Sequence, residues 1–137
     1  MSPFSPNIFT SPKGEWVALT HKDVGKVTVI STADMSIAKV ISTGATTNHV
    51  TFSNIKGKLS MLVTVGGENK IRIFDVADGF RQTDTINVGA LPHGLWPTPD
   101  GKRLYVGVTA VVKVPDLNDS SFKDHLHYTY DMAHWKG

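Results

Sequence analysis

Short stretches in which apolar and polar residues alternate run along most of the chain, separated by residues that favour turns. Alternation with a period of two, interrupted by Gly, Asn or Asp, is typical of antiparallel hairpins. Polar breaks at 21–25 and 66–69 divide two such sets of stretches. The expected strands lie at 16–20, 26–30, 37–41, 59–65, 71–74 and 83–88. The pattern therefore predicts an all-β protein.

The same pattern recurs with a period of about 44 residues. Three aligned segments each have an aromatic residue followed five positions later by glycine, ending at Gly14, Gly57 and Gly101, which lie 43 and 44 residues apart. A second marker agrees, because Gly44 and Gly89 are 45 residues apart. Including the strand before each turn, every repeat holds four strands. Four antiparallel strands in about 44 residues are typical of a propeller blade.

The repeats predict a partial β-propeller of about three four-stranded antiparallel blades, followed by an irregular C-terminal tail. The glycine markers divide the chain into blade 1 at 1–44, blade 2 at 45–89 and a partial blade 3 at 90–117. Residues 104–108 fit the second strand of the third unit, but the break expected after them is missing. The tail, 118–137, matches no repeat.

Three stretches carry a more specific signal than the strand pattern. They are 91–107 (LPHGLWPTPDGKRLYVG), 63–75 (VTVGGENKIRIFD) and 47–50 (TNHV). These stretches resemble the YVTN-type β-propeller repeat proteins of bacteria, a group near the cytochrome d1, nitrous-oxide reductase and lactonase propellers. The resemblance covers about residues 4–108. It identifies the repeat but not the chemistry, because the family includes enzymes, binding proteins and proteins of unknown role.

The resemblance implies a closed ring of about seven blades, whereas this sequence supplies about three. A propeller closes because its first and last blades meet and so leave no long exposed edges. We therefore expect a fragment: the truncated product of a longer gene, a chain that assembles with other copies, or a marginal and adhesive monomer. A degraded reading frame without an independent function is a further alternative.

Composition narrows the range of partners and of chemistry. Val, Ile and Thr together number 37 against 8 Leu, which favours strands over helices. Lys and Arg number 14 against 12 Asp and Glu. The sequence has no run of Lys and Arg of the kind that binds a phosphate backbone, so nucleic acid is not an expected partner. With no cysteine, the chain cannot form a disulfide, a thiolate metal site or a Cys nucleophile.

Two further features concern membranes and export. No stretch approaches 18 consecutive apolar residues, so we expect no membrane span. The first residues, 1–4, lack the basic and apolar regions of a signal peptide. The resemblance points the other way, since members of the family are commonly periplasmic or extracellular.

Residues at equivalent repeat positions meet around the axis of a propeller. The positions three residues before the aligned aromatics hold Pro6, His49 and His93. We expect the two histidines at the start of innermost strands, at the channel mouth, with Asn7 and Asn48 beside them. Such histidines can bind copper or another divalent metal such as zinc, or hold an anionic ligand. The simpler alternative is that each histidine forms a structural hydrogen bond with the backbone of a neighbouring blade, because two histidines alone do not complete a metal site.

The tail holds a second group of metal-ligating residue types. His125 and His127 would share one face of a strand, with Asp124, Asp131 and His134 nearby. These are acceptable ligands for zinc or copper. Because the segment has no clear scaffold, an incidental cluster is the simpler interpretation.

Other candidate features have structural explanations. The aligned aromatics Phe9, Phe52 and Trp96 are predicted to pack between blades, and the three glycine turns are predicted hairpin turns rather than phosphate loops. No serine lies in a nucleophile-elbow pattern, and the aspartates fall mostly in turns, so the sequence gives no argument for an enzyme.

Two functions follow from these observations. The first is a non-enzymatic propeller scaffold or binding module that uses its top face or channel for a small ligand or a protein partner. The second is a fragment of a propeller enzyme, either lactonase-like or a metal or haem redox protein, whose channel histidines serve as ligands.

Overall fold

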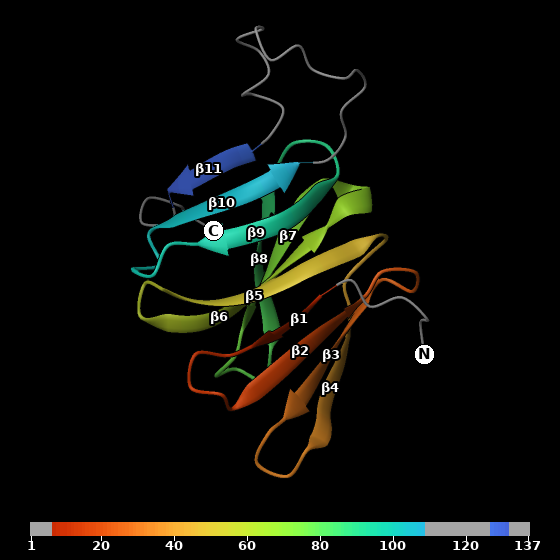
Figure 1. Ribbon diagram of the computed structural model, residues 1–137, viewed down its shortest axis with the longest axis vertical. Coiled ribbons are helices and arrows are strands. Elements are labelled where there is room, and N and C mark those ends of the chain that lie inside the picture. The colour runs from red at the N-terminus through yellow and green to blue at the C-terminus, as the bar shows by residue number, and fades with distance from the viewer. Residues whose placement is uncertain (1–6, 109–126, 132–137) are drawn as a thin grey trace, which may run out of the picture.

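Three antiparallel β-sheets make up the protein (Figure 1). The computed structural model describes residues 7–108 and 127–131. Sheet 1 contains β1 (Ile8–Thr10), β2 (Trp16–His21), β3 (Lys26–Ser31) and β4 (Ser36–Ser42). Sheet 2 contains β5 (Thr47–Ile55), β6 (Lys58–Val65), β7 (Lys70–Asp75) and β8 (Arg81–Asn87). Sheet 3 contains β9 (Pro92–Pro97), β10 (Arg103–Val108) and β11 (His127–Asp131).

The prediction of an all-β protein is confirmed. Across residues 7–108 and 127–131 the only helical element is η1 (Gly66–Glu68), a single 3-10 turn in the break between β6 and β7. No helix in this part of the chain is long and apolar enough to cross a membrane.

Each sheet is a meander in which strands that follow one another in the chain pair with one another. The turns between the first two strands of each sheet hold Gly14, Gly57 and Gly101, with φ of 73°, 79° and 70°. These values lie in the left-handed region, which glycine adopts without a steric penalty. The three aligned glycines are therefore hairpin turns, as predicted.

Sheet 2 lies between the other two sheets and is covered on both faces. Directly opposite residues in an antiparallel pair point to the same face. The pair Phe52 and Met61 therefore shares a face, and both side chains are buried with Ala18 of sheet 1. Leu62 points to the opposite face and is buried with Val106 of sheet 3. Two apolar cores thus hold a stack of three sheets together.

The first strands of the three sheets lie next to one another on one side of the stack. In Figure 1, β5 runs across the middle of the molecule between β1 and β9, and it contacts both. These three strands take the place that innermost strands take in a propeller.

Sheet 3 differs in one respect from the predicted blade. It has three strands in the described residues, and its outer strand β11 comes from the segment 118–137, which the repeat pattern left as an unmatched tail. β11 pairs antiparallel with β10, with Tyr105 opposite Thr129. The region of the missing break, after Val108, lies outside the described residues.

Candidate functional site

The structure brings His49 and His93 together, as the repeat spacing predicts. His49 lies near the start of β5 and His93 near the start of β9, and their ring centroids are 4.5 Å apart with the ring planes tilted by 54°. Burial lowers the pKa of His49, and the neighbouring His93 lowers it further. Both causes disfavour the protonated form, so the His49 imidazole is neutral at pH 7.

A buried hydroxyl links the strands that carry these two histidines. The Thr64 side chain, on β6, is fully buried, and its Oγ1 donates to the carbonyl oxygen of His93 at 2.7 Å. Thr64 Oγ1 also accepts the backbone N–H of His49 at 2.9 Å. Sheets 2 and 3 are therefore joined here through the histidine backbones and the Thr64 hydroxyl.

Thr20 makes the equivalent link between sheets 1 and 2. It is fully buried, and its Oγ1 donates to the carbonyl oxygen of Asn48 at 2.6 Å and lies 3.2 Å from that of Asn7. Thr20 and Thr64 are 44 residues apart, which is the repeat period. Neither threonine belongs to a motif recognised in the sequence, and their spacing is the signal that identifies them.

Both candidate asparagines hold backbone in place. Asn7 Oδ1 accepts the backbone N–H of Val50 at 3.0 Å, which ties the segment before β1 to β5. Asn48 is 3% exposed, and its Nδ2 donates to the Pro92 carbonyl at 3.4 Å. Asn48 Oδ1 is buried and has no hydrogen-bond partner among the described residues. Asn48 therefore links sheets 2 and 3.

A groove of about 510 Å³ runs along β5, between β1 and β9. His49 and Asn7 lie among its lining residues. Two exposed aromatic side chains also line it, Phe9 from β1 and Trp96 from β9, with 46% and 61% of their surface exposed. Polar groups of Ser53, Asn54 and Thr98 complete a lining that mixes aromatic surface with hydrogen-bonding groups.

The prediction that all three aligned aromatics pack between blades is wrong for two of them. Phe52 is 5% exposed and lies in the core between sheets 1 and 2, whereas Phe9 and Trp96 are exposed. Phe9 lies opposite the buried Ala18 and is exposed where it lines the groove. For Trp96 the reason is register. In sheet 3 it is Leu95, opposite Val106, that packs against sheet 2, so its neighbour Trp96 points to the other face.

The metal candidates divide into two groups. Within the described part of the chain, no three His, Cys, Asp or Glu residues are grouped so that they could hold a metal ion. Of the tail candidates, His125 and His134 lie outside the described residues, and only the backbone position of His127, at the start of β11, is described.

Comparison with known proteins places the fold. No protein-family model and no curated protein sequence matches the chain. Among solved structures, hydrazine synthase of Kuenenia stuttgartiensis matches 79% of the chain with a TM-score of 0.67 and 19% identity. A candidate 6-phosphogluconolactonase from Bacteroides uniformis matches 80% of the chain with a TM-score of 0.65 and 19% identity. Both are propeller-type structures.

The chain has a partial propeller fold. The matched part corresponds to 31% of the hydrazine synthase chain and 37% of the lactonase-like chain, so the chain spans about a third of these structures. At 19% identity the likeness concerns the fold and not the chemistry.

Proposed function

We propose that this chain is a non-enzymatic propeller module that binds a ligand in the groove along β5. The observation that supports the proposal is the groove itself, which lies on the channel-side strand of the middle sheet and is lined by Phe9, Trp96 and His49. Concave sites with aromatic walls and a few placed polar groups are typical of small-molecule binding. The resemblance of the repeats to YVTN-type propeller proteins is compatible with this role.

The lining defines the chemistry of the ligand. Phe9 offers an exposed ring face, on which a sugar ring or a planar heterocycle can stack. His49, Asn54 and Thr98 offer hydrogen-bonding groups along the same groove. Because His49 is neutral at pH 7, it gives the groove no positive charge there. The proposed ligand is therefore a small, uncharged molecule with a ring and several hydrogen-bonding groups.

Saturation-transfer NMR with glucose and adenine as probes tests the proposal. We expect at least one probe to bind, and Phe9→Ala or His49→Ala to weaken that binding at least tenfold. Met35→Ala is the matched control, because Met35 is also exposed but lies in the turn between β3 and β4, away from the groove. If neither probe binds, or if binding survives both groove substitutions unchanged, the proposal is wrong.

The histidine pair favours a second candidate function, a fragment of a propeller enzyme that uses channel histidines as metal ligands. Two imidazoles lie side by side with ring centroids 4.5 Å apart, and the lowered pKa of His49 keeps it in the neutral form that binds metals. Calorimetric titration with CuCl₂ checks this candidate. Stoichiometric binding that His49→Gln abolishes would support it, and the absence of binding heat would exclude it.

A further inference from the structure

Most of the exposed large apolar side chains of the described residues lie on the outer faces of sheets 1 and 3. The end face of sheet 1, turned away from sheet 2, carries Ile8, Ile37 and Val40, which are 60%, 66% and 53% exposed. The end face of sheet 3 carries Trp96 and Tyr105, which are 61% and 40% exposed. Large apolar faces of this kind mark interaction surfaces.

The end face of sheet 1 is a hollow lined mainly by aliphatic side chains. Strand pairing places Ile8 opposite Leu19, Thr28 opposite Val40, and Ile30 opposite Ile37. The opposite face of the same sheet carries the buried core residues Ala18 and Val29. The hollow has a volume of about 510 Å³, and its lining consists of Leu19, His21, Val24, Lys26, Thr28, Ile30, Ile37 and Val40.

The end face of sheet 3 instead carries two exposed aromatic side chains. Trp96 lies opposite Tyr105, so both side chains point away from the core that Leu95 forms with sheet 2. The Trp96 indole lies over Gly94, where a Cβ atom would collide with the ring. Glycine at this position therefore allows the indole to lie close to the sheet and to present its outer face.

The contacts within the molecule show how such faces meet. Sheet 1 covers one face of sheet 2 through Phe52 and Met61, and sheet 3 covers the other face through Leu62 and Ile73. Sheet 2 thus receives sheet 1 on one face and sheet 3 on the other. The end face of sheet 1 is the kind of face that receives a preceding sheet, and the end face of sheet 3 is the kind that receives a following one.

We propose that a second copy of this chain covers these end faces, with sheet 3 of one copy packed on sheet 1 of the other. The aromatic surface of Trp96 and Tyr105 then fills the aliphatic hollow around Ile37 and Val40, so that both apolar surfaces are removed from water. The contact is head-to-tail, because it joins two different faces. Two copies bring about six sheets into one ring, within the range of about four to eight blades of closed propellers.

Light scattering coupled to size exclusion, with a pair of complementary variants, tests this arrangement. We expect the unaltered chain to run at twice the mass of a monomer. Ile37→Lys damages the hollow and Tyr105→Lys damages the aromatic surface, so each variant alone becomes monomeric. An equimolar mixture of the two variants restores a dimer, because the intact hollow of one meets the intact aromatic surface of the other.

The controls separate this contact from misfolding and from other interfaces. Both changed side chains are exposed, and the far-ultraviolet circular dichroism of the variants should match that of the unaltered chain. Leu91→Lys, at a side chain 42% exposed between β8 and β9, should leave the dimer intact. Gly94→Ala, which displaces the indole without adding charge, should weaken the dimer at least tenfold.

Three results would overturn the proposal. A monomeric unaltered chain excludes it directly. A dimer that survives Tyr105→Lys shows that the end face of sheet 3 does not make the contact. A mixture of the two variants that stays monomeric excludes a head-to-tail contact.

Discussion

Two buried threonines carry the links between neighbouring inner strands. Thr20 connects the backbones at Asn7 and Asn48, and Thr64 connects those at His49 and His93. A buried hydroxyl that satisfies backbone groups on two strands fixes their spacing, because removing it leaves those groups without partners. The geometry of the histidine pair thus depends on a residue that contacts neither imidazole in these bonds.

Replacement of Thr64 by valine tests this dependence. Valine keeps the shape but leaves the His49 N–H and the His93 carbonyl without the hydroxyl, so we expect the free energy of unfolding to fall by about 1–3 kcal/mol. Urea denaturation monitored by circular dichroism measures the change. Thr10→Val, at an exposed position of β1, is the control and should change stability by less than about 0.5 kcal/mol. Equal effects of the two changes would contradict the linking role.

The contact between His49 and His93 could be predicted from the sequence, but the burial of the neighbouring side chains could not. Repeat spacing places both at the start of equivalent strands, and the rings are indeed in contact. The burial of Asn48 depends on Pro92 of the next sheet, a contact between residues 44 positions apart. The repeat spacing identifies equivalent positions, but it does not predict which of their side chains are exposed.

At the scale of the strand and the hairpin, the position of a turn and the sheet face on which a side chain lies depend on different features of the chain. The glycine turns align in all three repeats because left-handed backbone favours glycine there. The face that a strand residue occupies depends instead on its pairing partner, and a shift by one residue reverses it. For this reason Phe52 is buried while Trp96, its aligned counterpart, is exposed.

The hairpin glycines allow a test that separates backbone strain from steric contact. Gly57 and Gly101 have similar φ values of 79° and 70°, but a Cβ at Gly57 meets nothing within 4 Å. A Cβ at Gly101 would collide with the carbonyl oxygen of Asn54. We expect Gly57→Ala to cost about 1–2 kcal/mol through strain alone. Gly101→Ala should cost distinctly more.

Thermal denaturation of the two variants measures this difference. The larger loss at Gly101 reflects contact between the β9–β10 turn and the end of β5, and so between sheets 3 and 2. Equal melting temperatures would show that the turn moves away from Asn54 without a cost.

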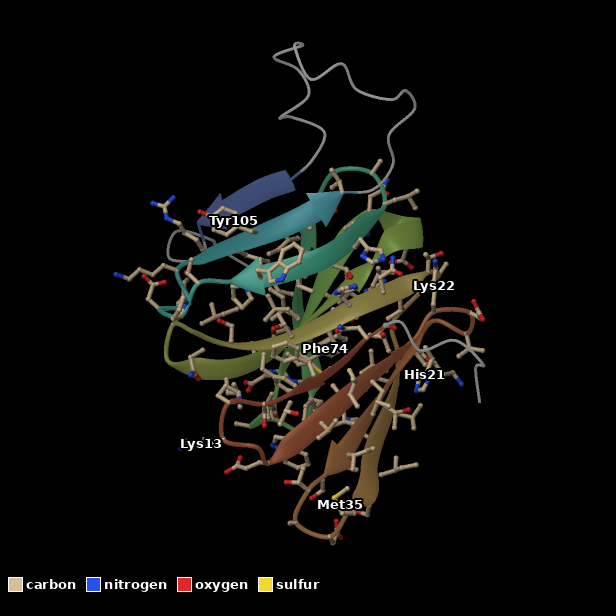
Figure 2. All side chains as sticks on the ribbon, viewed as in Figure 1. Lys13, His21, Lys22, Met35, Phe74 and Tyr105 are labelled. Carbon is tan, nitrogen blue, oxygen red and sulfur yellow. The ribbon has the colours of Figure 1, made fainter. Side chains whose placement is uncertain are left out.

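At the scale of the whole molecule, the three sheets differ in how fully they are covered. Sheet 2 has an apolar core on both faces, with Leu62, Met61 and Phe74 all at most 2% exposed. Its central strands, β6 and β7, contribute side chains to the core with sheet 1 and to the core with sheet 3. In Figure 2, Phe74 lies in the middle of the molecule, whereas Met35 and Tyr105 lie towards opposite ends. In a stack where each sheet contacts only its neighbours, stability is expected to be highest in the middle.

Native-state hydrogen exchange checks this gradient. We expect the amides of β6 and β7 to exchange slowest, because opening them requires both cores to separate. Amides of β4, where six of the seven residues are exposed, should exchange fastest among the paired strands. Uniform protection across the three sheets would show that the stack opens only as one unit.

The meander order of the strands also bears on how the chain folds. Nearly every pair of neighbouring strands is joined by a short connection, so each pairing closes a small loop and loses little chain entropy. Local pairings of this kind speed folding relative to sheets built from distant strands. The pairing of β10 with β11 is different, because residues 109–126 separate the two strands in the chain. Sheets 1 and 2 can therefore form early, and the last strand of sheet 3 closes the slowest loop of the fold.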